Sequence, residues 1–271
     1  MIPKIIHQTW KDKMLPDILQ NILEENKKMI PGYEFCLWTD DEIVDLIARE
    51  YPFLLKVYQA TRTGVQKGDI ARLVLVHHYG GIYADLDMLI MKDPIEGLQL
   101  SEDKLYVTYE PGAQTMKLYN RTDYICNAFF AANKNNNMLG FALQNMGGVF
   151  QRNGPSVFMQ FDIFGGSYLK SIIETYVNYQ NEVHIIENRD LVFPINDLKF
   201  NNLSSSQSDW QMLKDASYLP NTVMVHYWIH GDFESKKLLT EYRCDKNVDI
   251  HKNIFKFFST LYAGNAKELC Y

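Results

Sequence analysis

The sequence predicts an α/β fold with a mostly parallel central sheet in a single domain. Three observations lead to this prediction. Short apolar segments typical of strands alternate with segments of helical spacing along the first half of the chain. An apolar fraction of 46% over 271 residues is enough to bury a sizeable core. The pair Gly80 and Gly81 separates the longest helical segment from the most apolar strand, as expected where a helix ends in a left-handed residue.

The individual elements follow from hydrophobic spacing and from residues that begin or end helices. Strands are predicted at residues 3–9, 33–40, 82–91, 104–110 and 127–133, and a late strand running into a loop is predicted at residues 222–233. Helices are predicted at residues 16–31, 40–52, 63–79, 137–150 and 253–264. Beyond residue 154 the pattern is looser, and the polar segment at 201–210 predicts a loop.

Composition excludes several classes of function. The formal charge of −6 and the pI near 5.7 argue against nucleic-acid binding through a broad basic surface. No apolar run approaches the roughly 20 residues needed to span a bilayer, and the first residues lack the apolar core of a signal peptide. We therefore expect a cytoplasmic enzyme, with peripheral membrane contact left open and its oligomeric state undetermined.

The segment "GGIYADLDM" carries two aspartates, Asp85 and Asp87, inside an otherwise apolar stretch. In a strand, residues two apart point to the same face, so both carboxylates would project together. Two ionised carboxylates on one face repel, and burying them without a partner is costly. Oxygen ligands of this kind select Mg²⁺ or Mn²⁺, which often also bind substrate phosphates. The pattern predicts a site for a divalent cation and a diphosphate.

The run "KGDIARLVLVHHYGGIYADLDM" resembles the DXD-containing signature of glycosyltransferase family 32. The segments "IPKIIHQTW" and "LWTD" are similar to its first two strands, and "NAFFAANKNN" and "NGPSVFMQ" to weaker later blocks. The resemblance implies a GT-A fold, a Rossmann-like nucleotide-binding domain. It also implies a nucleotide-sugar half at residues 1–110, an acceptor half at 111–271, and a retaining transferase.

The resemblance also implies roles for particular residues, beginning with a catalytic set of Asp69, Arg72, Asp85 and Asp87. Asp69 would accept hydrogen bonds from sugar hydroxyls, and Arg72 would hold a carboxylate or a phosphate oxygen. The acceptor hydroxyl would attack from the face of the leaving diphosphate, although Asp69 could instead act as a nucleophile.

The remaining candidate residues are assigned to donor binding and to the metal. His7, Gln8, Thr9 and Trp10 lie at the carboxyl end of the first strand, where ligands of open α/β sheets collect. Tyr83, Asn127 and Gly154 complete the expected cofactor-binding set. A late histidine is expected to join Asp85 and Asp87 on the metal; His226 in "VHYW" is favoured over His230.

The predicted activity is metal-dependent transfer of a hexose from a nucleotide-diphosphate sugar to a glycan, glycolipid or glycoprotein acceptor, as in polysaccharide biosynthesis. The metal would be Mn²⁺ or Mg²⁺. A UDP-hexose donor is favoured, and GDP-mannose stays open. Two other functions remain alternatives, a non-catalytic module that binds nucleotide sugars or glycans and a metal-dependent phosphohydrolase.

Overall fold

The computed structural model describes residues 1–153, 164–194, 220–229 and 233–265. Within these ranges the main strands form a six-stranded sheet in the order β2-β1-β3-β6-β5-β7. The strands are β1 Ile5–Thr9, β2 Glu34–Trp38, β3 Gly81–Ala84, β5 Leu105–Tyr109, β6 Ile125–Ala132 and β7 Val183–Ile186. β1 runs parallel to β2 and β3, β5 runs parallel to β7, and β6 is antiparallel to both of its neighbours. The predicted α/β class with a mostly parallel sheet is therefore confirmed.

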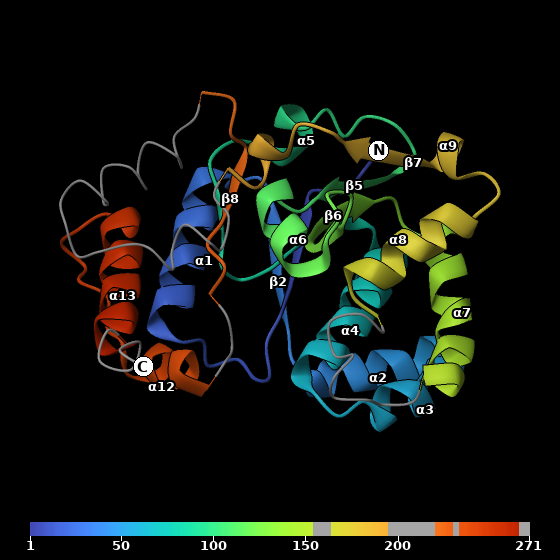
Figure 1. The fold of residues 1–271 in the computed structure, drawn as a ribbon, viewed down its shortest axis with the longest axis horizontal. Helices are drawn as coiled ribbons and strands as arrows, with labels where there is room; N and C mark the ends of the chain where they lie inside the picture. The colour runs from blue at the N-terminus through green and yellow to red at the C-terminus, as the bar shows by residue number, and fades with distance from the viewer. Residues whose placement is uncertain (154–163, 195–219, 230–232, 266–271) are drawn as a thin grey trace.

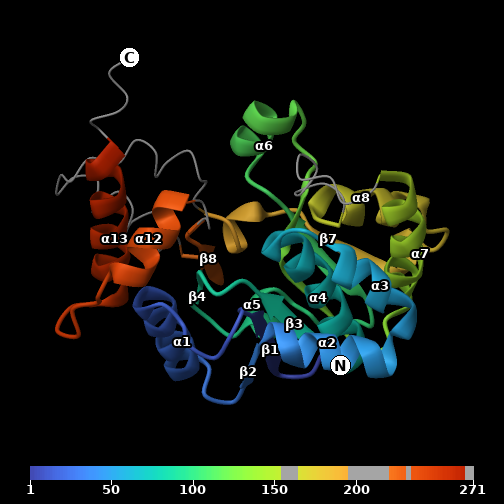
Figure 2. The same ribbon diagram turned by 90° about the horizontal axis from the view of Figure 1, so that it is seen from below.

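Helices cover both faces of this sheet (Figures 1 and 2). One face packs against α2 Asp40–Glu50, α3 Pro52–Ala60, α4 Gly64–Tyr79, α7 Asn137–Asn153 and α8 Gly166–Thr175. The other face packs against α1 Asp17–Met29, and α12 Phe233–Glu241 and α13 Ile250–Asn265 pack against α1 in the same apolar core. The short elements are α5 Pro94–Gly97, α6 Gly112–Tyr119, α9 Tyr179–Glu182 and the 3₁₀ turn at Arg189–Leu191. Each face of the sheet has its own apolar core, as a parallel sheet requires.

Helix α4 ends where the sequence predicts. Gly80 has φ of +70° and Gly81 has φ of +104°, a region that residues with a side chain rarely adopt. A Cβ atom at Gly80 would lie 2.6 Å from the backbone nitrogen of Lys134, and one at Gly81 would lie 2.7 Å from the carbonyl oxygen of Ile5. The two glycines let the chain pass directly from a buried helix into a strand packed tightly against β1.

The strand predicted for residues 82–91 is wrong in one respect. β3 ends at Ala84, a turn follows in which the Met88 amide donates to the Asp85 carbonyl at 3.1 Å, and β4 begins at Met88 and ends at Ile90. β4 does not continue in the main sheet but pairs antiparallel with β8, Met224–His226. The aspartates therefore flank a turn between two sheets, because the chain changes pairing partner between them.

Several elements were not predicted, including α6, α8 and β7. The C-terminal helix was predicted, and its aromatic residues Phe255, Phe257 and Phe258 pack into the core with exposures of 8%, 0% and 2%. No helix in the described ranges has the length and apolar character that crossing a membrane requires.

Candidate active site

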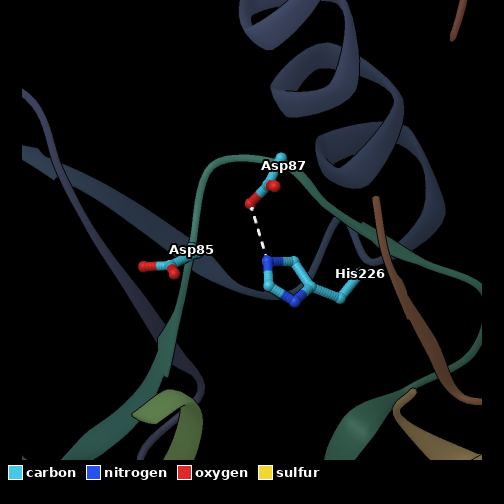
Figure 3. A group of neighbouring side chains, drawn as sticks. All are labelled: Asp85, Asp87 and His226. Carbon is cyan, nitrogen blue, oxygen red and sulfur yellow. Dashed lines mark ion pairs between the residues drawn. The ribbon is translucent and has the colours of Figure 1, made fainter. Parts of the chain in front are cut away.

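Three side chains able to bind a metal meet beside the turn that follows β3 (Figure 3). One ligand atom each from Asp85, Asp87 and His226 lies within 4.8 Å of the other two. Nε2 of His226 is 3.2 Å from Oδ1 of Asp87. Two carboxylates and an imidazole are a donor set that accepts Mn²⁺ or Mg²⁺. These residues therefore fit a divalent cation, while His230 lies outside the described residues.

Asp87 is bound to the segment that leaves β8. Its carbonyl oxygen accepts from the Tyr227 amide at 3.1 Å, and its Oδ2 accepts from the Ile229 amide at 2.7 Å. Between these amides, Trp228 adopts φ of +54°, unusual for a bulky residue, and its ring lies 4.1 Å from that of His226. Asp87 and His226 are 7% and 6% exposed, so the pair is set in a nearly dry environment.

Asp85 is held instead by the six-stranded sheet. Its amide donates to the Ala128 carbonyl at 2.9 Å, which extends the pairing of β3 with β6 by one residue. The Tyr83 hydroxyl donates to Oδ1 of Asp85 at 2.8 Å, and Nη2 of Arg72 lies 3.6 Å from the same oxygen. Both contacts orient this carboxylate, whose side chain is 28% exposed and accessible to a ligand.

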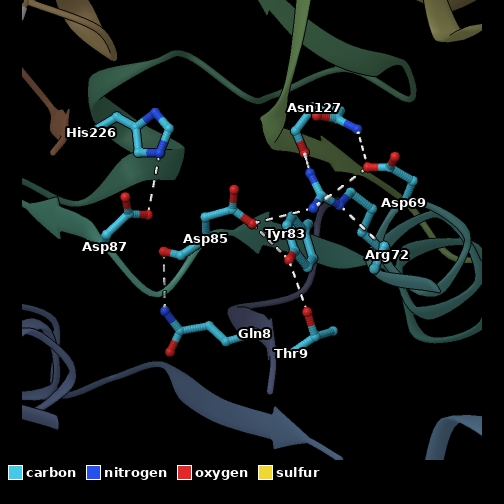
Figure 4. A network of polar contacts seen from close by, with 10 residues as sticks. Gln8, Thr9, Asp69, Arg72, Tyr83, Asp85, Asp87, Asn127 and His226 are labelled. Atoms are coloured by element: carbon cyan, nitrogen blue, oxygen red, sulfur yellow. Dashed lines mark hydrogen bonds and ion pairs between the residues drawn. The ribbon is translucent and has the colours of Figure 1, made fainter. Parts of the chain in front are cut away.

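A buried polar network lies next to Asp85 (Figure 4). Arg72 donates through Nη1 to the Asn127 carbonyl at 2.8 Å, and its Nη2 is 3.6 Å from Oδ1 of Asp69. The Asn127 amide donates to Oδ1 of Asp69 at 2.7 Å. The Arg72 guanidinium also lies over the Tyr83 ring, 4.9 Å from its centroid. The predicted neighbours Asp69 and Arg72 are thus not a surface ion pair but part of one network with the acidic pair.

The electrostatics of this network are unusual. Burial raises the pKa of Asp69 to about 6, although Arg72 and the Asn127 amide work against the shift. Burial alone would lower the pKa of Arg72, but the carboxylate of Asp85 and the groups of Tyr83 and Asp69 outweigh it and raise that pKa. Oδ2 of Asp69 is buried without a hydrogen-bond partner in the part of the chain that the structure describes. An unpaired carboxylate oxygen is costly, so this atom is suited to accept from a bound hydroxyl.

His7, predicted to line a base pocket, has a structural position instead. Its Nδ1 accepts from the Trp38 indole at 3.1 Å, and Nε2 is 2.8 Å from the Gly80 carbonyl. This arrangement fixes a neutral ring with its proton on Nε2. Burial lowers the pKa of His7 to about 4. The imidazole connects the end of α4 to β1, and both of its nitrogens form hydrogen bonds within the protein.

The other candidates at the carboxyl end of β1 lie nearer the acidic pair. The Gln8 side-chain amide donates to the Asp85 carbonyl at 3.4 Å, and the Thr9 hydroxyl is 3.1 Å from the Tyr83 hydroxyl. Trp10 is half-buried, and its indole nitrogen has no partner among the described residues. Gln8 and Thr9 therefore support the turn, whereas Trp10 stays a candidate for a ring contact with the donor base.

Some parts of the site lie beyond sequence reasoning or beyond the described residues. Gly154 falls outside the described ranges. The amides of Tyr227 and Ile229 and the left-handed Trp228 were not predicted, because nothing in a tryptophan signals a positive φ. Asn127, expected in the cofactor-binding set, contacts Asp69 through its side-chain amide, which the sequence did not predict.

Comparison with known proteins agrees with this geometry. Residues 16–107 match the family model described as "Glycosyltransferase sugar-binding region containing DXD motif". The match includes α1, the Asp69 and Arg72 pair, and both aspartates of the turn.

Two curated yeast proteins are similar to about a third of the chain. Inositol phosphoceramide mannosyltransferase 1 of Schizosaccharomyces pombe is 36% identical over 99 residues, 35% of this chain and 31% of that protein. Mannosyl phosphorylinositol ceramide synthase SUR1 of Saccharomyces cerevisiae is 36% identical over 87 residues, 32% of this chain and 23% of that protein. The matched region spans less than a third of the length of these relatives.

A solved structure extends the likeness to the fold of the whole chain. The UDP-bound glycosyltransferase domain from the YGT toxin aligns over 96% of this chain and 99% of its own length, with a TM-score of 0.50 and 9% identity. At this identity the likeness concerns the fold alone, which is of the GT-A type. The resemblance to glycosyltransferase family 32 is thereby confirmed: the chain carries that family's DXD-containing sugar-binding region at residues 16–107 on a GT-A fold.

Proposed function

We propose that this protein is a divalent-cation-dependent, retaining glycosyltransferase that moves a hexose from a nucleotide-diphosphate sugar to a glycan, glycolipid or glycoprotein acceptor. The observation that supports this most strongly is the meeting of Asp85, Asp87 and His226 beside the buried Asp69 and Arg72. This arrangement supports binding of a diphosphate through the cation, next to a sugar bound by Asp69. The family match over residues 16–107 includes four of these five residues.

The donor is proposed to be a mannose nucleotide. One yeast relative is named as a mannosyltransferase and the other as a mannosyl phosphorylinositol ceramide synthase, and each matches about a third of the chain. GDP-mannose is therefore favoured over the UDP-hexose that the sequence alone suggested. The UDP in the toxin structure has no bearing on the base, because that likeness concerns the fold alone.

The two halves of the chain are proposed to divide the substrates. Residues 1–110 would bind the nucleotide sugar, since they supply β1, α4 and the acidic pair. Residues 111–271 would supply Asn127, His226 and the acceptor side. A glycolipid acceptor is favoured, because the relatives' names refer to ceramide-containing acceptors.

The residues of the site act together on the bond between the sugar and the diphosphate. A cation held by Asp85, Asp87 and His226 would stabilise the negative charge that develops on the departing diphosphate. Asp69 accepts a hydrogen bond from a sugar hydroxyl through its unpaired Oδ2. Arg72 keeps Asp69 and Asp85 at fixed positions and faces the reaction with a permanent positive charge. The nearly dry environment of Asp87 and His226 strengthens each of these interactions.

The two other functions receive less support. A two-metal phosphohydrolase needs further acidic or histidine ligands. In the described ranges, Asp85, Asp87 and His226 form the one group of three or more such residues close enough to share an ion. A non-catalytic module that binds nucleotide sugars would use the buried Oδ2 of Asp69 in the same way, so turnover in the assay below separates it from the transferase.

The test is an assay of sugar release and transfer with a panel of nucleotide sugars in Mn²⁺, on wild type and Asp87→Asn. The asparagine keeps the shape of the side chain and removes its charge, so turnover should fall by about two orders of magnitude. Asp93→Asn is the matched control, because Asp93 caps α5 and contacts Tyr33 away from the site. Phosphate release from simple esters would indicate the hydrolase instead, and tight binding without turnover would indicate the module.

A further inference from the structure

The metal-binding residues straddle two sheets that are not joined by strand pairing among the described residues. Asp85 extends the six-stranded sheet. Asp87 directly precedes β4, and His226 is the last residue of β8, so both belong to the two-stranded sheet. The distance from Asp85 to the other two ligands therefore depends on what holds the small sheet in place.

One side chain of α1 holds β4 directly. Nδ2 of Asn26 donates to the Met88 carbonyl at 2.8 Å, and its Oδ1 accepts from the Ile90 amide at 2.7 Å. Asn26 is 1% exposed and lies on the buried face of α1 among isoleucines and leucines. A polar residue in this position has both of its polar atoms matched to the backbone of one strand.

Asn26 takes the place of a third strand at the free edge of β4. The amide of Met91 and the carbonyl of Asp87 bond toward β8, so the groups of Met88 and Ile90 face the opposite edge by the alternation of an antiparallel pair. A buried backbone edge without partners is costly. The Asn26 carboxamide supplies one donor and one acceptor at the spacing that this edge presents.

We propose that Asn26 is a positioning residue for the cation site: by fixing the β4 backbone it sets Asp87, and through the β8 pairing His226, in register with Asp85. This inference rests on the proposed function, since it concerns the cation that the three ligands would bind. Met88 directly follows Asp87 and pairs with His226, so a shift of β4 moves both ligands together relative to the main sheet.

The test is Mn²⁺ affinity of the protein without nucleotide, followed by the EPR signal of free Mn²⁺, together with the melting temperature. Asn26→Leu keeps the branched shape and removes both hydrogen bonds. Thr108→Val is the matched control, because Thr108 is 0% exposed and its hydroxyl donates to the Ile186 carbonyl at 2.9 Å between β5 and β7. Asn26→Ala admits water to the two backbone groups and so provides a milder variant if the leucine variant does not fold.

We expect both Asn26 variants to raise the Kd for Mn²⁺, by about 10-fold or more for leucine, as for other groups that orient ligands. Thr108→Val should lower the melting temperature and leave that Kd unchanged within about twofold. Wild-type Kd values in both Asn26 variants, with binding still lost in Asp87→Asn, would overturn the positioning role and leave the cation site intact. Binding that is absent in wild type or unaffected by Asp87→Asn would overturn the cation site and this inference with it.

Discussion

The six-stranded sheet and the two-stranded sheet hold the acidic pair by different means. Asp85 is bound by side chains of the main sheet and of α4, among them Tyr83 and Arg72. Asp87 is bound by backbone amides that follow β8 and by His226. Asp85 is therefore positioned mainly by buried polar and charged side chains, whereas Asp87 is positioned mainly by backbone amides. We infer that changes to the first act on stability and activity together, whereas changes to the second act mainly on metal binding.

Removal of Arg72 is expected to have the largest effect. Arg72→Met removes the guanidinium group that lies between the carboxylates of Asp69 and Asp85. Breaking a buried ion pair in this way costs about 3–5 kcal/mol of stability. Equilibrium unfolding in urea should show this loss, and activity should fall with it. Arg49→Met is the control, because Arg49 pairs with Glu50 at the surface and its side chain is 63% exposed, where an ion pair adds little to stability. Equal losses in the two variants would contradict the buried network.

Removal of His226 should separate activity from stability. His226→Gln keeps a polar side chain but not an imidazole, and we expect turnover to fall about 100-fold, equivalent to about 2.7 kcal/mol. The accompanying loss of stability should be smaller than that of Arg72→Met. His77→Gln is the matched control, because His77 bonds to the Tyr51 hydroxyl at 2.7 Å and lies outside the site. A variant of His226 with wild-type turnover would show that His226 is not a ligand of the cation.

His7 should affect the pH dependence of stability and leave the chemistry unchanged. Its pKa is about 4 in the folded protein and about 6.5 when unfolded, so between these values the unfolded state binds more protons. The contribution of His7 to the free energy of unfolding is therefore fully present above about pH 6.5. About 2 kcal/mol of this contribution is lost between about pH 7 and pH 5. Asp69 acts in the opposite sense, because its raised pKa makes the folded state retain a proton below about pH 6.

The His7 contribution is isolated by comparing wild type with His7→Gln in urea at both pH values. The advantage of wild type over the variant should shrink by about 2 kcal/mol at the lower pH. A constant advantage would mean that the ring is protonated in the folded state and that its assigned contacts are wrong.

Gln8 should have the smallest effect. Its amide reaches the Asp85 carbonyl at 3.4 Å, a long hydrogen bond, and that carbonyl also accepts from the Met88 amide. Gln8→Met should therefore cost less than about 1 kcal/mol in urea unfolding. A loss as large as that of Arg72→Met would place Gln8 among the residues that determine the turn.

The sequence predicts the main sheet well because its signals are local. Strand-helix alternation, the acidic cap of α2 and the Gly80-Gly81 pair each act within a few residues. The pairing of β4 with β8 carries no local signal, because Met88 and His226 are 138 residues apart in the sequence and meet only in the tertiary fold. The strand pattern of 82–91 therefore hid the turn at Asp85 to Asp87. Resemblance to a family supplied the roles expected of Asp69 and Arg72, whereas their burial in one network with Asp85 follows only from the structure.

One polar residue of the cation site's surroundings carries a signal in the sequence, because it lies on an apolar helix face. Asn26 interrupts the buried stripe of Ile18, Leu19, Ile22 and Leu23, which signals a buried hydrogen-bond partner. The identity of that partner, the backbone of β4, follows only from the structure.

The most direct test of the cation site is a pulsed EPR measurement on Mn²⁺ bound to the protein without nucleotide. We predict one bound ion, a ¹⁴N coupling from the imidazole that disappears in His226→Gln, and no tight binding in Asp87→Asn. Mn²⁺ bound with wild-type affinity and spectrum in both variants would contradict the assignment of Asp85, Asp87 and His226.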